Sequence, residues 1–210
     1  MDEHRIQRNA ITEGSILKQL MNFFFPVLLG MLFQQLYNMA DAVIVGRFVG
    51  KNALAAVGGS ASQILNLIIG FFTGLCSGAT VIIAQYYGAN DDEDVSKGVQ
   101  TAIVFAAVCG VIMTVVGIVT APWLLRIMDT PEETMADSVS YMRIVYMAMI
   151  PAMIYNMGSA ILRAVGDSKR PLYFLIICCV LNVAMDIVAV VVFDLAVEGV
   201  AIATSLAQLI

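Results

Sequence analysis

Long runs of residues without a single charge alternate with short polar segments along this chain of 210 residues. Gln19–Ala40 is one such run, Asn52–Asn90 is a longer one, and Gly98–Leu125 is a third. Each can cross a bilayer as a helix, because a span needs about 20 predominantly apolar residues. The runs are continuous rather than alternating in polarity, which favours helices over the strands of a membrane barrel. The pattern predicts six helices, over residues 15–46, 53–87, 95–120, 136–161, 171–193 and 196–210.

The predicted connections between these helices are short. Even the longest, Pro122–Glu133, has no room for a soluble domain. Residues 1–14 mix both signs of charge and contain no small-residue cleavage site, so the first helix is not a signal peptide. The sequence predicts an all-α integral membrane protein, with residues 1–14 as a cytoplasmic N-terminal segment and residues 15–210 as a six-helix transmembrane bundle.

Composition and charge agree with a membrane protein and exclude other classes. Hydrophobic residues make up 60% of the chain and charged residues 13%, whereas a soluble domain carries about 25% charged residues. The net charge of −5 provides no basic surface for nucleic acid.

The distribution of Lys and Arg predicts the orientation of the bundle, because cytoplasmic loops are enriched in these residues. A cytoplasmic N-terminus puts seven basic residues inside, namely Arg5, Arg8, Lys18, Lys97, Arg163, Lys169 and Arg170. It leaves four outside, namely Arg47, Lys51, Arg126 and Arg143. The asymmetry favours a cytoplasmic N-terminus.

Residues typical of enzyme active sites are sparse. All four cysteines fall inside predicted helices without a CxxC pair, and His4 is the only histidine. A Cys/His metal site and a Cys–His or Ser–His–Asp nucleophile therefore fail on the number of available side chains. The sequence predicts no enzyme activity and no organic cofactor.

Two acidic residues lie within the apolar helices, Asp41 in the first and Asp186 in the fifth. A carboxylate at bilayer depth costs at least about 2.5–3.5 kcal/mol, so such residues normally face a cavity or a partner. At 1.5 Å per residue, Asp41 and Asp186 lie about 8 Å and about 11 Å from the outer ends of their helices. The alternative is that both reach water at the outer interface.

Three uncharged polar residues are predicted at a similar depth. Asn182 lies one turn from Asp186 on the same face, and Thr204 and Tyr141 lie comparably deep in their own helices. Carboxylate, amide and hydroxyl oxygens suit Na⁺ or a proton better than a soft metal. The pattern predicts a cation site in the outer half of the bundle. Alternatively, the uncharged members bond only one another or the backbone.

Prolines and glycines within the helices indicate bends and close contacts. Pro26 and Pro151 lie inside predicted helices, where the missing backbone N–H permits a kink. Gly70, Gly74 and Gly78 form two overlapping GxxxG units, which allow a neighbouring helix to approach closely.

Several segments, in this order along the chain, resemble signatures of the multidrug and toxic compound extrusion (MATE) family, prokaryotic DinF-like branch. They are residues 26–58, AQYYGAND (84–91), ILRAVGDSKRP (161–171), LNVAMD (181–186) and VEGVAIAT (197–204). The resemblance implies one lobe, the N-terminal one, of a twelve-helix transporter with two six-helix lobes and a drug cavity between them. It implies antiport of H⁺ or Na⁺ against cationic or amphipathic drugs across a prokaryotic plasma membrane.

The resemblance also implies roles for individual residues. Asp41 matches the coupling carboxylate of the first helix, and Pro26 matches a bending proline. The cation site, with Na⁺ as a possible occupant, is matched by Asp41, Asn182, Asp186 and Thr204. The surrounding network is matched by Tyr141 and Asn156, and the drug cavity by Gln34 and Tyr37.

The resemblance covers one lobe only. The last predicted helix has about 15 residues and a length of about 22 Å, against a hydrocarbon core of about 30 Å. We therefore expect a missing C-terminal six-helix lobe, in the same chain. The alternative is a dimer of half-transporters.

Two other functions fit the pattern less well. A lipid-linked precursor flippase of the wider superfamily is expected to place cationic residues in the central cavity, and Arg143 is the one candidate that the sequence offers. A non-transporting membrane scaffold leaves Asp41 and Asp186 without a purpose.

Overall fold

The computed structural model describes residues 15–192 and 197–207, and every regular element in these ranges is helical. The predicted N-terminal segment, residues 1–14, lies outside the described residues. The helices are α2 (Ile16–Ile44), α3 (Lys51–Gly58), α4 (Ser60–Gly88), α5 (Asp92–Ile127), α6 (Glu132–Met147), α7 (Met149–Ala164), α8 (Lys169–Ile187) and α9 (Val197–Ala207). Two short π-helices, η1 (Val45–Val49) and η2 (Val188–Val192), continue α2 and α8.

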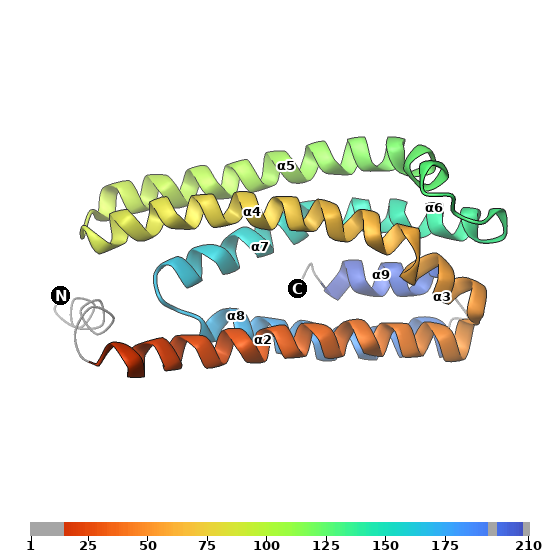
Figure 1. The fold of residues 1–210 in the computed structure, drawn as a ribbon, viewed down its shortest axis with the longest axis horizontal. Helices are drawn as coiled ribbons and strands as arrows, with labels where there is room; N and C mark the ends of the chain where they lie inside the picture. The colour runs from red at the N-terminus through yellow and green to blue at the C-terminus, as the bar shows by residue number, and fades with distance from the viewer. Residues whose placement is uncertain (1–14, 193–196, 208–210) are drawn as a thin grey trace.

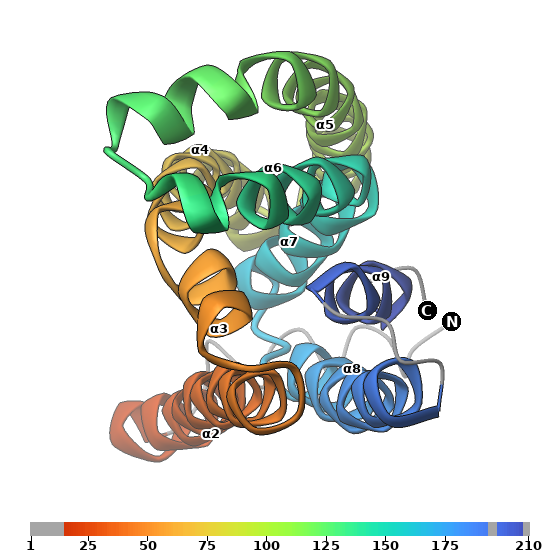
Figure 2. The ribbon, with the colours of Figure 1, turned by 90° about the vertical axis from the view of Figure 1, so that its right-hand side faces the viewer.

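The long helices run side by side along the longest axis of the molecule (Figure 1). α4, α5, α6 and α7 form one group, α2 and α8 pair beside it, and α9 lies between the two groups (Figure 2). The main apolar core joins α4, α5, α6 and α7 around Phe72, Leu125, Tyr146 and Met153. The fold is therefore an all-α bundle, as the hydrophobic pattern predicts.

The described helices have the lengths and polarity of membrane spans. Four stretches are long and apolar enough to cross a bilayer, namely Ile16–Val49, Lys51–Gly88, Asp92–Ile127 and Lys169–Val190. The bent pair α6 and α7 provides a fifth if it counts as one span. Within the described part of the chain, the sixth predicted helix contributes only the shorter apolar segment α9.

Large apolar side chains cover the outside of the bundle. Leu67 is 77% exposed, Val119 is 73% exposed and Trp123 is 63% exposed. A soluble monomer rarely presents such an extended apolar surface, so these side chains face lipid or another apolar partner. The chain is a multi-pass membrane protein.

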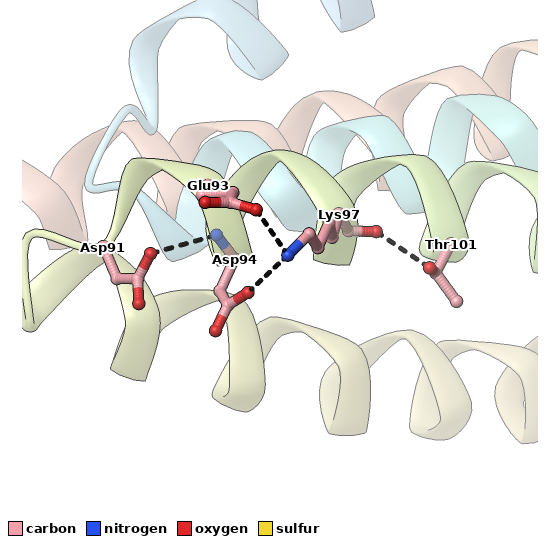
Figure 3. A network of polar contacts seen from close by, with 5 residues as sticks. All are labelled: Asp91, Glu93, Asp94, Lys97 and Thr101. Atoms are coloured by element: carbon pink, nitrogen blue, oxygen red, sulfur yellow. Dashed lines mark hydrogen bonds and ion pairs between the residues drawn. The ribbon is translucent and has the colours of Figure 1, made fainter.

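Charged residues gather at the ends of the helices. At the start of α5, the Asp91 carboxylate caps the helix by accepting a 3.1 Å hydrogen bond from the Asp94 backbone N–H (Figure 3). Lys97 pairs with Glu93 at 2.8 Å and with Asp94 at 3.3 Å, and the Thr101 hydroxyl donates to the Lys97 carbonyl (Figure 3). These pairs are solvent-exposed, so water screens them and they add little to stability. They mark the polar end of α5.

One predicted connection is wrong in part. The segment Pro122–Glu133 is expected to be non-helical, but α5 continues through Pro122 to Ile127. Ala121 and Leu125 are fully buried on either side of the proline. The burial of these side chains offsets the loss of the backbone hydrogen bond that Pro122 cannot make, so the last turns of α5 remain helical.

The predicted helix over 136–161 begins earlier, at Glu132, and is broken by a 53° bend between α6 and α7. The break lies at Ala148, three residues before Pro151. The proline has no N–H to bond the Met147 carbonyl, and its ring crowds that turn. The Thr114 hydroxyl of α5 donates a 2.8 Å hydrogen bond to the Tyr146 carbonyl beside the break.

The closest helix contacts occur at Gly110 and Gly117 and not at the GxxxG glycines that the sequence indicates. A Cβ added at Gly70, Gly74 or Gly78 would have no neighbour within 4 Å. A Cβ added at Gly110 would collide with the Ile150 backbone, and one at Gly117 with the Tyr146 ring. Among the helices of residues 15–192 and 197–207, none packs closely against these GxxxG glycines. The close approach is that of α5 to α6 and α7, across the bend.

Candidate cation site

The two acidic residues of the apolar helices lie on neighbouring elements. Asp41 belongs to the last turn of α2 and Asp186 to the last turn of α8, and these two helices pack along each other. Asp186 is fully buried and Asp41 is partly buried. Their carboxyl groups are close enough to interact electrostatically.

Asn182 and Thr204 join the same cluster. The Asn182 amide, one turn before Asp186 on α8, donates a 3.3 Å hydrogen bond to the Thr204 hydroxyl on α9. Tyr37, one turn before Asp41, donates a longer bond of 3.5 Å to the same hydroxyl. Three elements, α2, α8 and α9, thus meet at Thr204.

Tyr141 completes the cluster from α6, since its side chain lies near both carboxyl groups. The structure therefore brings together the five residues for which the sequence predicts a similar depth: Asp41, Tyr141, Asn182, Asp186 and Thr204. It also adds Tyr37, which the family resemblance assigns to the drug cavity. Tyr37 precedes Asp41 by four residues, one helical turn. This i, i+4 spacing is the signal in the sequence that could have assigned Tyr37 to the cluster.

Several oxygens of the cluster have no donor among the described residues. Asp41 Oδ1, Asn182 Oδ1 and both carboxylate oxygens of Asp186 are buried without a hydrogen-bond partner. Buried oxygens without partners are costly, and two adjacent carboxylates also repel each other. A proton or a small cation relieves both costs. The all-oxygen set fits Na⁺, because hard cations prefer such ligands.

Apolar packing and π-helical turns surround the cluster on one side. Val45, Val190 and Val200 are buried in a small apolar core next to it. Val45 begins η1, four residues after Asp41, and Val188 begins η2, two residues after Asp186. Single π-turns inside helices occur frequently at functional sites.

The other residues that the resemblance singles out lie in a different region. Pro26, Gln34 and Asn156 line a pocket of about 660 Å³ between α2, α7 and α8. The Asn156 amide donates to the Ala152 carbonyl within α7, and Asn156 makes no described contact with the carboxyl groups. α2 continues through Pro26 as one helix from Ile16 to Ile44.

A second pocket, of about 450 Å³, lies beside the first, between α4 and α7, and Phe23 of α2 completes it. The two pockets share Asn156 and Arg163. Arg143, the cationic residue that the sequence suggests for a central cavity, lines neither of these two pockets, whereas Arg163 lines both. The bend at Ala148, three residues before Pro151, sets the direction in which α7 presents Arg163.

Comparison with known proteins decides the family. The family model described as MatE matches residues 26–188. The chain belongs to the MatE family. This is a family of transporters, and the match includes Asp41, Asn182 and Asp186.

Curated MatE relatives cover nearly the whole chain. The probable multidrug resistance protein YoeA of Bacillus subtilis is 34% identical over 174 residues, which is 83% of this chain and 37% of YoeA. The probable multidrug resistance protein YpnP of the same organism is 30% identical, over 94% of this chain and 44% of YpnP. The chain therefore spans less than half the length of these relatives.

Solved structures of MATE transporters have the same fold. An outward-facing MATE family transporter of the MOP superfamily superposes with a TM-score of 0.89 at 27% identity, over 96% of this chain and 44% of that one. A MATE transporter in the straight conformation and one in the bent conformation give TM-scores of 0.87 and 0.88. The bundle thus corresponds to one lobe of a MATE-type transporter.

Proposed function

We propose that this chain is the cation-coupling N-terminal lobe of a multidrug efflux transporter that exchanges H⁺ or Na⁺ for cationic or amphipathic drugs. The observation that carries the proposal is the pair of interacting carboxyl groups, Asp41 and Asp186. Asp41 Oδ1 and both Asp186 oxygens are buried without a hydrogen-bond donor in the described part of the chain. Relatives named as probable multidrug resistance proteins support drugs as the substrates.

Coupling follows from competition for negative charge. With no ion bound, the two carboxylates repel each other and attract a cationic drug. Binding of Na⁺, or of a proton shared between Asp41 and Asp186, removes that attraction and favours drug release. Alternating access then requires that ion binding change the packing of α2, and Pro26 is the position in α2 at which a bend costs least.

The donor set supports Na⁺ and H⁺ in different ways. Asp41, Asn182, Asp186 and Thr204 would hold Na⁺ through oxygens alone. A proton needs only the two neighbouring carboxyl groups. Coupling to Na⁺ would therefore depend on Asn182 and Thr204, whereas coupling to H⁺ would not. Substitutions of these two residues distinguish the two coupling ions.

The complete transporter, in this proposal, has a second six-helix lobe in the same chain. Matched relatives and solved structures are more than twice as long as the segment they share with this chain. The drug cavity would lie between the two lobes, in a prokaryotic plasma membrane with the N-terminus in the cytoplasm. A dimer of half-transporters is the alternative arrangement.

The test is transport in proteoliposomes by the purified two-lobe transporter, which is this chain together with its second lobe. A Na⁺ gradient at equal pH and a pH gradient without Na⁺ are imposed separately, and uptake of a fluorescent cationic dye is recorded. We expect accumulation with one of the two gradients and none when the gradient is collapsed by an ionophore.

The proposal fails if neither gradient drives uptake of any cationic or amphipathic dye while the reconstituted protein remains folded. Circular dichroism and gel filtration provide the control for folding. A gradient-independent leak of dye would contradict coupling in the same way.

A further inference from the structure

The two pockets beside α7 have an unusual charge pattern. Arg163 lines both of them, and no other charged residue lines either. The rest of the polar lining consists of hydroxyl and amide side chains. On the α4 side these are Thr73, Ser77 and Thr80, and on the α2 side Gln34 and Gln35. The pockets are therefore positively charged, unlike the cluster around Asp41 and Asp186.

The Arg163 guanidinium has no carboxylate partner within residues 15–192 and 197–207. The nearest acid along the chain, Asp167, pairs with Arg170 at 3.1 Å and accepts backbone bonds from Lys169 and Arg170 at the start of α8. Asp167 is thus committed to the α8 N-terminus. An arginine with five donors and no acidic partner is suited to bind a carboxylate or a phosphate in two-pronged geometry.

Apolar side chains line the larger pocket next to Arg163. Val27 and Met31 of α2 and Leu172 and Leu175 of α8 belong to its lining. A volume of about 660 Å³ lies in the range of pockets that hold small organic molecules. A polar end next to apolar walls matches an amphipathic ligand.

The positive and negative regions are separated along α2. Gln34, in the pocket, precedes Asp41 by seven residues, which corresponds to about 10 Å along the helix. Neither Asp41 nor Asp186 lines the pocket that Gln34 and Arg163 share. The two regions select different charges on the ligand.

We propose that Arg163 binds the anionic group, a carboxylate or a phosphate, of an amphipathic molecule whose apolar part lies against the apolar lining that α2 and α8 contribute to this pocket. The inference deepens the proposed transport function, since it adds amphipaths with an anionic group to the substrates of this lobe. A free amphiphile and a phospholipid headgroup share this chemistry.

Equilibrium binding without any ion gradient tests the proposal. The protein is placed in phosphatidylcholine nanodiscs and titrated with octyl phosphate by calorimetry, with octyltrimethylammonium as the cationic counterpart. We expect octyl phosphate to bind and Arg163→Gln to weaken it at least about tenfold, because a charged hydrogen-bonded contact is lost. Arg163→Lys retains the charge and should recover part of the affinity.

Arg143→Gln is the matched control, because it removes the same charge from an exposed residue that lines neither pocket. It should leave octyl phosphate binding unchanged. Equal affinity for octyl phosphate in wild type and Arg163→Gln, or an equal loss in Arg143→Gln, overturns the proposal. Gel filtration of each variant separates loss of binding from loss of folding.

Replacing part of the phosphatidylcholine by phosphatidylglycerol distinguishes the two sources of the anionic group. A lower apparent affinity for octyl phosphate assigns the site to a lipid headgroup, and an unchanged affinity assigns it to a free amphiphile. The same titration on Asp41→Asn distinguishes anion binding at Arg163 from the proposed antiport. Retained octyl phosphate binding in Asp41→Asn supports a site at Arg163 even where dye transport fails.

Discussion

The Asn182 amide on α8 donates a 3.3 Å hydrogen bond to the Thr204 hydroxyl on α9. This bond uses the amide nitrogen and leaves Asn182 Oδ1 buried without a partner. The same hydroxyl accepts from Tyr37 on α2. Thr204 therefore holds three elements together while the free oxygens of the cluster remain available to a cation.

Thr204→Val should destabilise the bundle, because it removes the acceptor for Tyr37 and Asn182 while nearly conserving volume. The expected loss is about 1–2 kcal/mol, the size of one or two hydrogen bonds between membrane helices. Thermal unfolding in detergent measures it. Thr204→Ser keeps the hydroxyl and should retain most of the stability; equal losses in both variants would show that the methyl group, not the hydroxyl, matters.

Gly117→Ala should destabilise the contact of α5 with α6. A Cβ at this position overlaps the buried Tyr146 ring, and neither side has room to move. Overpacking of this kind costs about 1–3 kcal/mol. Gly70→Ala is the control, since its Cβ would point into open space. A neutral Gly117→Ala, or a loss as large in Gly70→Ala, would contradict the packing described for α5.

Thr114→Val should weaken the bend between α6 and α7. The Thr114 hydroxyl is the donor to the Tyr146 carbonyl beside the break, so its loss is expected to cost about 1 kcal/mol. Thr120→Val removes a hydroxyl that bonds only within α5, to Val116, and should be nearly neutral. The difference in melting temperature between the two variants checks the assignment; its absence would mean that the bend does not depend on Thr114.

Gly50→Ala should destabilise the turn that joins η1 to α3. Gly50 has φ of 121°, a left-handed value that is strained for any residue with a Cβ, although the space around it is open. The expected cost is about 1–2 kcal/mol from the backbone alone. Gly58→Ala adds a Cβ in equally open space at an ordinary φ, so it should not lower the melting temperature. Similar melting temperatures for the two alanine variants would refute the strain at Gly50.

The sequence predicts the class of the fold and the place of Asp41 and Asp186 near the ends of their helices, because both depend on patterns along single helices. Charge-free runs set the helix lengths, and distance from a helix end sets how deep Asp41 and Asp186 lie. The i, i+4 relation of Asn182 and Asp186 places both on one face. These relations survive folding, since they need no knowledge of which helices become neighbours.

What the sequence misses depends on the direction of each helix in space. The position of the bend at Ala148 follows from Pro151 three residues later, yet its angle of 53° comes from how α7 packs on α5. That angle carries Arg163 into both pockets, which the hydrophobic pattern does not reveal. The GxxxG units on α4 mislead for the same reason, because spacing identifies small residues but not the helix that packs against them.

Coupled efflux in carboxylate variants tests the central claim most directly. Dye accumulation in proteoliposomes is measured for the two-lobe transporter as wild type, Asp41→Asn and Asp186→Asn, under whichever gradient drives the wild-type protein. Asp137→Asn, which changes an exposed acid on α6, is the control. A neutral amide neither exchanges a proton nor balances a cation, so we predict that Asp41→Asn and Asp186→Asn each abolish gradient-driven accumulation while Asp137→Asn retains it. Wild-type accumulation in both Asp41→Asn and Asp186→Asn, at equal reconstitution, would contradict the role of this carboxyl pair.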